Sequence, residues 1–373
     1  MGRRQPTDLQ SPGSFDHVGR DAESTGLVMG RVLAELAGAD DRIHVATADL
    51  TYVTQLDDFA RRHPERFSQF GISERNMFSA AAGMAAAGLR PYIATFGSFA
   101  ALLAYECIRT DIAYPGLPVR ILATHSGISM GFFGTSHHAT EDIAALRAVA
   151  GLTVVSAPDG PALEALLHAT VDHPGPVYFR IGRGRERALY DDVPEPYGPG
   201  APTVIASTGS DVLLVATGIV VVEARDALEA LEREGIGGTV LDVHTLKPFP
   251  AVAIAAHAGA HETVVTVEEH TVEGGLGTLV VEAVASHGLS VPVHKHGLYD
   301  EFGIVGPPTH LYRYYGLDAA GIEVVVRRAV GCTHRGGAPA EHAPLWASMD
   351  TEAVLAAVTE RDAVRSFPRF EPG

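Results

Sequence analysis

The sequence predicts an α/β protein of two domains, each built on a parallel or mixed sheet. Strand-like apolar runs alternate with helix-like segments along most of the chain, a pattern typical of a sheet covered by helices on both faces. A polar stretch rich in proline, glycine and acidic residues, 187–203, interrupts this alternation, which then begins again. A chain of 373 residues with 46% hydrophobic content is long enough to bury the cores of two domains.

The first domain is expected to span residues 23–186. Residues 1–22 are polar and are expected to be flexible, because they bury too little apolar surface to offset the entropy lost on ordering. Apolar periodicity then predicts these elements in chain order: helix 27–36, strand 42–50, a helix before residue 66, an alanine-rich helix from residue 74, strand 91–96, helix 98–114, strand 119–125, helix 141–149, strand 152–158, helix 160–171 and strand 176–182.

The stretch 187–203 is interpreted as a linker to a second domain, residues 204–330. Residues 331–373 form a C-terminal extension of irregular composition, within which 349–364 is predicted to be a short helix. The second domain is predicted to contain strand 211–218, helix 220–235, strand 237–249, strand 261–270, a glycine-rich turn feeding a helix at 273–288, and strand 291–298.

Charge and composition exclude several classes of partner. The formal net charge is −17, and no basic stripe is visible, which argues against nucleic acid and anionic membranes as ligands. No apolar run reaches the length of a membrane span and the N-terminus lacks an apolar signal segment, so we expect a cytoplasmic protein. Cys107 and Cys332 are far apart and form no CxxC pair, which favours a reducing compartment and no structural zinc.

Two weaker motifs receive no functional role. The glycine-rich stretch "EGGLGTLVVEA" lacks the G-x-G-x-x-G spacing of a dinucleotide site and is interpreted as a tight turn before a helix. His244 and Lys247 lie in "LDVHTLKPFP", where a lone histidine at a strand end is more often structural than a ligand.

A single carboxylate, Glu74, is placed in the first turn of the alanine-rich helix, with Ser73 as its expected N-cap. An acid at a helix N-terminus is favourable in itself, so this position alone does not indicate catalysis. The helix leaves almost no side-chain bulk around Glu74, and its small residues are Ala80, Ala81, Ala82, Gly83, Ala85, Ala86 and Ala87.

The residues around Glu74 resemble, nearly without gaps, the pyrimidine-binding domain of the transketolase family. The resemblance runs through "GISERNM", "YIATFGSFAALLAYECIR" and "ILATHSGISMGFFGTSHHATEDIAALR". It continues to about residue 327 through "YFRIGRG", "VLDVHTLKPF" and "VTVEEHTVEGGLGTLVVEA". Transketolases and the β-subunits of 2-oxoacid dehydrogenases share this architecture, and the string "HHATEDIA" is more similar to split bacterial transketolases.

The resemblance implies that the chain binds thiamine diphosphate. In this family the glutamate, here Glu74, hydrogen-bonds N1′ of the aminopyrimidine and drives that ring toward its imino tautomer. Phe96 and Phe99 correspond to aromatic residues that stack on the pyrimidine. Asp49 and Ile72 are expected beside the cofactor, Asp49 at a subunit contact. Where the family has a third aromatic residue one turn later, this chain has Leu102.

The resemblance also implies a substrate channel. His125 and His137 match family histidines that handle protons of carbonyl and hydroxyl groups, with His138 behind them. Phe133 lies in the channel where the family has an acid that binds a sugar hydroxyl.

Contacts to an acceptor phosphate depart from the family pattern. Val53 replaces a serine, and an arginine expected near Gly26 is absent. Arg180 retains the phosphate-binding type, although an isolated arginine is equally compatible with a structural ion pair. These departures predict a less polar or carrier-bound aldehyde acceptor rather than an ordinary pentose phosphate.

The family's metal-binding "GDG" motif and its later asparagine have no match; Asp159-Gly160 lies in the pyrimidine-binding region. The resemblance therefore implies a separate N-terminal-type subunit that supplies the Mg²⁺ ligands, no metal ligands in this chain, and an α2β2 heterotetramer. The expected activity is two-carbon ketol transfer from a ketose to an aldehyde. The alternatives are a decarboxylating 2-oxoacid dehydrogenase β-subunit, which a lipoyl-carrier partner would distinguish, and a non-catalytic assembly subunit.

Overall fold

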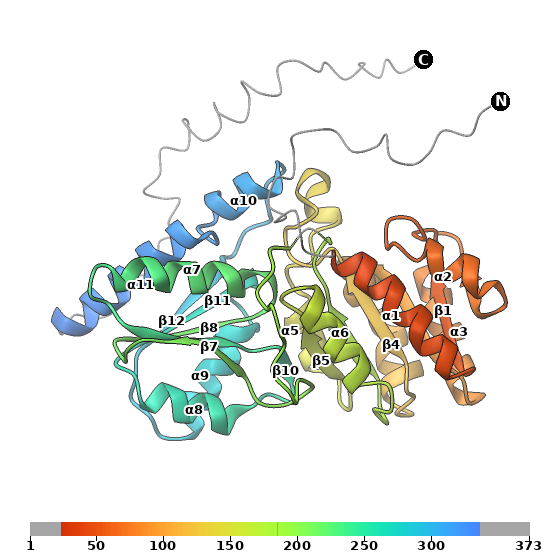
Figure 1. Ribbon diagram of the computed structural model, residues 1–373, viewed down its shortest axis with the longest axis horizontal. Helices are drawn as coiled ribbons and strands as arrows, with labels where there is room; N and C mark the ends of the chain where they lie inside the picture. Colours follow the sequence, from red (N-terminus) through yellow and green to blue (C-terminus); the bar gives the residue numbers. More distant parts are fainter. Residues whose placement is uncertain (1–23, 185, 336–373) are drawn as a thin grey trace, which may run out of the picture.

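The computed structural model describes residues 24–184 and 186–335, with side chains as far as Gly331. It confirms the predicted class: two α/β domains lie side by side, each a sheet between helices (Figure 1). The segment 1–22, the predicted helix 349–364 and most of the C-terminal extension lie outside the described residues. Cys107 is a buried free thiol.

The first domain contains a seven-stranded sheet in the order β10-β5-β6-β4-β3-β1-β2. Its strands pair in parallel except β10, which is antiparallel to β5. The strands are β1 (Ile43–Thr47), β2 (Phe67–Gln69), β3 (Arg90–Phe96), β4 (Arg120–Thr124), β5 (Thr153–Ser156), β6 (Val177–Arg180) and β10 (Thr245–Lys247).

Helices bury both faces of this sheet, because successive strand residues point to opposite sides. In β4, Ile121 packs in the core beneath α3, whereas Leu122 packs in the core beneath α1 and α6. This double burial explains why the strands read as continuous apolar runs. The helices are α1 (Thr25–Ala39), α2 (Asp57–Arg62), α3 (Glu74–Ala86), α4 (Tyr105–Cys107), α5 (Asp142–Arg147) and α6 (Gly160–Ala169).

The segment predicted as one helix over 98–114 differs from a regular α-helix. It consists of two π-helical stretches, Phe99–Leu103 and Ile108–Ala113, on either side of the short α4. Characteristic i+5 hydrogen bonds join the N–H of Ala104 to the carbonyl of Phe99 (3.1 Å) and that of Tyr114 to Arg109 (3.0 Å). Hydrophobic periodicity distinguishes helix from strand, but it does not resolve one extra residue in a turn.

The second domain contains a five-stranded sheet in the order β12-β11-β8-β9-β7, with β7 antiparallel to β9. The sequence analysis missed β7, α8, α10 and α11, and α11 continues past residue 330. Its elements are β7 (Thr203–Ser207), β8 (Val212–Ala216), α7 (Val221–Glu232), β9 (Gly238–Asp242), α8 (Ala251–Gly259), β11 (Val264–Thr271), α9 (Leu276–Ser286), β12 (Val293–Leu298), α10 (Pro308–Tyr314) and α11 (Ala319–Arg335).

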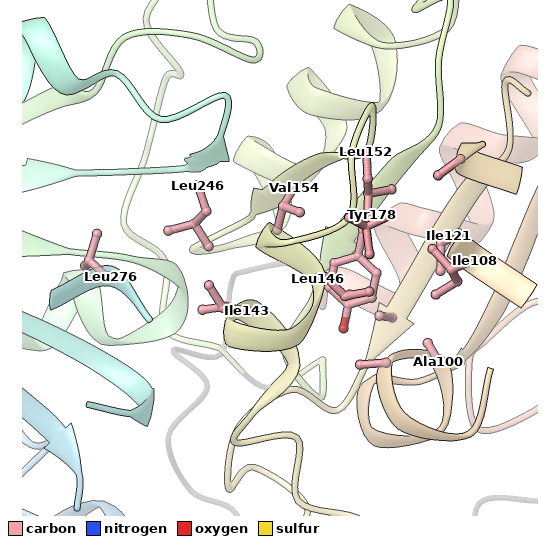
Figure 2. Close-up of a cluster of buried hydrophobic side chains, with 14 of the residues drawn as sticks. Ala100, Ile108, Ile121, Ile143, Leu146, Leu152, Val154, Tyr178, Leu246 and Leu276 are labelled. Carbon is pink, nitrogen blue, oxygen red and sulfur yellow. The ribbon is translucent and has the colours of Figure 1, made fainter. Parts of the chain in front are cut away.

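The predicted strand 237–249 divides between the two sheets. Its first part, β9, stays in the second domain, and its second part, β10, crosses to pair with β5 of the first. The buried core is continuous across this crossing: Figure 2 shows it running from Ile108 through Ile143 and Val154 to Leu246 and Leu276. The two domains therefore share this one of their hydrophobic clusters.

The predicted linker is fixed by hydrogen bonds to both domains. The hydroxyls of Tyr190 and Tyr197 donate to Asp242 Oδ2 (2.8 Å each), and the N–H of Tyr190 donates to Asp159 Oδ2 (2.9 Å). The ring of His244 stacks on Tyr197 with centroids 4.2 Å apart, which fits the structural role expected of it. The linker is therefore part of the domain interface.

We predict that Arg120→Met destabilises the fold strongly. The buried guanidinium at the start of β4 donates to the carbonyls of Thr170 (2.7 Å), Val171 (3.2 Å), His173 (2.7 Å) and Gly175 (3.0 Å). These are hydrogen bonds of a charged, buried group, worth about 1.5–3 kcal/mol each, so urea denaturation should show a loss of at least about 3 kcal/mol.

The matched control is Arg42→Met. Arg42 is exposed and pairs with Asp40 at the surface, so its loss should cost less than about 1 kcal/mol. Equal losses for the two variants would contradict the role assigned to Arg120.

Candidate active site

Three neighbouring parallel strands, β1, β3 and β4, end at the same edge of the first sheet. Asp49 follows β1, Phe96 ends β3 and His125 follows β4. In open parallel sheets the crevice beyond the carboxyl ends of the strands is the usual ligand site. The fold therefore brings together residues from three separate parts of the sequence.

Glu74 is the first residue of α3, and it is only 7% exposed. Its Oε1 lies 3.4 Å from the hydroxyl of Thr95, which donates to it. Ser73 occupies the N-cap position, but its side chain makes no capping hydrogen bond, contrary to the sequence expectation. Ile72, two residues before Glu74, is 86% exposed.

The alanine-rich helix α3 is buried on one side only. Met77, Phe78 and Ala81 face the core, whereas Gly83 and Ala86 on the opposite side are exposed. The exposed small residues therefore lie on the side of α3 away from the buried Glu74, whose neighbours on the same helix face are Met77 and Phe78.

Five rings gather at the strand ends. The ring of Phe96 lies 4.5 Å from that of His125, 5.5 Å from Phe99 and 5.7 Å from His137, measured between centroids. The ring of His137 also lies 5.2 Å from Phe99 and 4.8 Å from Phe133. The aromatic and histidine residues singled out in the sequence thus form one contiguous cluster.

The hydrogen bonds of His125 define its tautomer. The hydroxyl of Thr124 donates its proton to the carbonyl of Thr95 (3.3 Å), and it lies 3.0 Å from His125 Nδ1. A hydroxyl has one proton, so while Thr124 donates to Thr95 its contact with His125 is an Nδ1–H that donates to Thr124. In the neutral ring this leaves Nε2 as the proton acceptor.

The same arrangement recurs at His137. The hydroxyl of Ser136 donates to the carbonyl of Phe133 (3.2 Å) and lies 2.8 Å from His137 Nδ1. Both candidate histidines therefore contact the hydroxyl of the preceding residue through Nδ1, and Nε2 is the ring nitrogen outside that contact.

Burial keeps these imidazoles neutral. Burial, with smaller contributions from Arg183 and His137, lowers the pKa of His125 from 6.5 to about 3. Burial also lowers the pKa of His137 and of the neighbouring His138. At neutral pH both rings are uncharged, and each has one unprotonated nitrogen that can accept a hydrogen bond from a hydroxyl group.

Arg180 is placed differently from the sequence expectation. Its guanidinium is buried and pairs with Asp142 at 3.1 Å, and it donates to the carbonyl of Glu269 at 2.7 Å. These contacts favour the alternative of a structural ion pair for Arg180.

Arg183, which the sequence analysis missed, lies near the cluster instead. Its charge contributes to lowering the pKa of His125, so the guanidinium is close to that ring. The motif "YFRIGRG" contains two arginines three residues apart, so it offered Arg183 as a second candidate beside Arg180. Only the fold distinguishes the buried one from the one beside the site.

The remaining predicted positions lie after β1, in α1 and in the π-helical stretch after β3. Asp49 is exposed in a left-handed conformation (φ 61°), and its N–H donates to Gln69 Oε1. Val53 and Leu102 are 47% and 50% exposed. A Cβ on Gly26 would lie 2.9 Å from the Gln55 side chain, which explains why a large residue is absent there.

Other described clusters offer no competing site. Glu35, Glu164 and His168 have the donor atoms for a metal ion, but Arg31 pairs with both carboxylates. Among residues 24–184 and 186–335, every helix is too short or too polar to cross a bilayer.

We predict that His125→Gln reduces the dependence of the free energy of unfolding on pH in the acid range. The unfolded chain takes up a proton on this histidine below pH 6.5, whereas the folded chain does so only near pH 3. Stability present above pH 6.5 is therefore lost as the pH falls, with a slope approaching about 1.4 kcal/mol per pH unit. Urea denaturation between pH 7 and 5 should show a shallower loss in the variant.

His125→Asn is the conformational control, because His125 has φ 59° and asparagine tolerates this left-handed region. Both variants should reduce this dependence on pH, while the asparagine costs less stability at pH 7. Slopes equal to the wild-type slope would contradict the neutral, buried state of His125.

Comparisons with known proteins identify both domains. A family model for the transketolase pyrimidine-binding domain matches residues 22–187, and a model for the transketolase C-terminal domain matches residues 202–322. The chain is 37% identical over 293 residues to a putative transketolase C-terminal section of Methanocaldococcus jannaschii, covering 79% of this chain and 92% of the relative.

A second relative is a 6-deoxy-6-sulfo-D-fructose transketolase subunit of Clostridium sp., 36% identical over 304 residues, with 82% of this chain and 92% of the relative covered. A solved structure described as a split gene transketolase, inactive beta4 tetramer, superimposes with a TM-score of 0.75 and 37% identity, covering 83% of this chain and 99% of that one. This chain belongs to the transketolase family and comprises its pyrimidine-binding and C-terminal domains.

Proposed function

We propose that this chain is the catalytic C-terminal-type subunit of a split transketolase that uses thiamine diphosphate. The observation that carries the proposal is Glu74, a buried carboxylate that accepts a hydrogen bond from Thr95, the residue that precedes Phe96 and its ring contact with Phe99. The similarity to relatives named as a transketolase C-terminal section and as a transketolase subunit supports it.

The site fits an aminopyrimidine. A buried carboxyl group can share a proton with a ring nitrogen, and the Phe96–Phe99 pair offers aromatic faces to a flat ring. Bound thiamine diphosphate supplies the stabilised carbanion that C–C bond cleavage and formation require. Glu74 would hold the pyrimidine and its proton, while Asp49 and Ile72 would line the exposed edge of the cofactor.

The reaction breaks the C2–C3 bond of a ketose and joins its two-carbon unit to the carbonyl carbon of an aldehyde. The donor hydroxyl on C3 loses a proton as the first aldehyde leaves, and the acceptor oxygen gains one as the new bond forms. His125 and His137 would hold and move these protons through Nε2, the acceptor nitrogen of each neutral ring. Arg183 would add a positive charge near His125.

A partner subunit would supply the Mg²⁺ and diphosphate site. Several large apolar side chains are exposed after β1, after β2 and in the helical segment between β3 and β4, as expected of a surface that another chain covers. They are Tyr52 (73%), Ile72 (86%), Leu102 (50%), Leu103 (55%) and Tyr114 (91%). With the exposed small residues of α3, they support the proposed N-terminal-type partner and homodimerisation to an α2β2 heterotetramer.

The acceptor would be less polar than a pentose phosphate. Phe133, half-exposed beside His137, occupies the place of an acid that binds a sugar hydroxyl. Arg180 is engaged in its buried pair, and Val53 offers no hydroxyl to a phosphate. A less polar or carrier-bound aldehyde in a specialised biosynthetic reaction fits this lining.

We predict that Glu74→Gln lowers kcat of the reconstituted two-subunit enzyme by about 100-fold or more, because the amide cannot share a proton with the pyrimidine. The assay is ketol transfer from hydroxypyruvate to an aldehyde, with thiamine diphosphate binding measured by calorimetry. The control is Glu65→Gln, at an exposed glutamate in the turn Pro64–Arg66, which should leave kcat unchanged.

Wild-type activity in the Glu74→Gln enzyme would refute the catalytic assignment and favour a non-catalytic assembly subunit.

We also predict that the wild-type enzyme prefers an unphosphorylated apolar aldehyde, such as benzaldehyde, to ribose 5-phosphate. Phe133→Asp should shift the ratio of kcat/KM values toward hydroxylated aldehydes by about tenfold, because the new carboxylate can accept hydrogen bonds from sugar hydroxyls.

Phe132→Asp, at the adjacent half-exposed aromatic residue, is the matched control and should leave the ratio unchanged. A wild-type preference for ribose 5-phosphate would contradict the proposed acceptor class and leave the proposed reaction unaffected.

A further inference from the structure

The segment that carries His137 is anchored mostly by the second domain. We call residues 127–138 the histidine loop; it is closed at its base by two hydrogen bonds between Gly127 and Ala139 (3.1 and 2.9 Å). The loop belongs to the first domain in sequence, and it also presents Phe133 to the site.

Glu269 of β11 holds the start of this loop. Its fully buried carboxylate accepts from the N–H of Ile128 at 2.8 Å through Oε1, and the same oxygen accepts from the hydroxyl of Tyr312. Gly127 has φ 58°, and a Cβ there would lie 2.1 Å from Glu269 Cδ. The loop backbone therefore lies directly against the Glu269 side chain, with no space for a substituent between them.

The other end of the loop packs against the segment 303–308 of the second domain. The N–H of Gly306 donates to the carbonyl of Gly131 at 3.2 Å. A Cβ on Gly303 would lie 2.5 Å from His138 Nδ1, so the backbone at 303 contacts the buried ring next to His137. The loop is thus held at both ends by residues more than a hundred positions away in the sequence.

We propose that Glu269 is a positioning residue for the substrate: by anchoring Ile128 it sets where the histidine loop presents His137. Any shift of the loop leaves the buried N–H of Ile128 without its acceptor, which opposes such movement. The second domain contributes no ring to the site cluster, but through Glu269 it determines how the acceptor aldehyde fits against His137. This inference rests on the proposed function, because it takes His137 to contact the substrate.

The test compares Glu269→Ala with Glu268→Ala in the reconstituted enzyme. Glu268 is the matched control: it is buried on the same strand and also accepts from backbone N–H groups, those of Leu276 (2.7 Å) and Gly277 (2.8 Å), which begin α9 rather than the histidine loop. Glu269→Gln is the conservative variant, since its carbonyl oxygen can still accept from Ile128.

With hydroxypyruvate as donor and benzaldehyde or ribose 5-phosphate as acceptor, Glu269→Ala should raise the acceptor KM by about tenfold with a smaller change in kcat, since misplacement by about 1 Å is costly. Glu269→Gln should restore the KM, and Glu268→Ala should leave it unchanged. If Glu269→Ala does not fold, Gly303→Ala tests the same loop through its contact with His138, with the same KM effect expected.

Hydrogen–deuterium exchange of this chain measures the anchoring without any activity. Exchange across residues 127–138 should accelerate in Glu269→Ala and not in Glu268→Ala. Equal exchange in the two variants, or equal acceptor KM values, would overturn the inference. A wild-type enzyme without ketol-transfer activity would instead refute the proposed function, while the exchange comparison still decides whether Glu269 anchors the loop.

Discussion

The burial of one carboxylate at the start of α3 is the constraint on which the site depends. Glu74 is held out of water and hydrogen-bonded to Thr95 at 3.4 Å. The carbonyl of Thr95 in turn accepts from Thr124, whose hydroxyl fixes His125 (3.0 Å). A polar chain therefore links the proposed cofactor carboxylate to a proposed substrate histidine through two neighbouring strands. The parallel pairing of β3 with β4 determines that these residues meet.

The surrounding protein supplies rigidity from several sides. The first domain gives the strand ends, the π-helical stretch places Phe99 beside Phe96, and the second domain holds the histidine loop through Glu269. The shared core and the strand β10, which belongs in sequence to the second domain, tie the two domains together. This rigidity suits the proposed role, in which the site residues must already be in place when the partner subunit binds.

Much of the site could be predicted from sequence because its residues lie in compact motifs at strand ends. The cluster of Phe96, His125 and His137 follows directly from the alternation of strands and helices and from the family resemblance. For Arg180 the sequence left phosphate binding and a structural ion pair open, because hydropathy alone does not show which of two nearby arginines points inward from a strand buried on both faces. The anchoring role proposed for Glu269 could not be predicted from the sequence around it, because its partners Ile128 and Tyr312 are distant in sequence.

The most direct test of the account is a crystal structure of the two-subunit complex with thiamine diphosphate and Mg²⁺. We expect a pyrimidine nitrogen at hydrogen-bond distance, about 2.6–3.2 Å, from the Glu74 carboxyl group, with the ring against Phe96 and Phe99. A coenzyme ring bound away from Glu74, or a complex without a coenzyme between the chains, would contradict it.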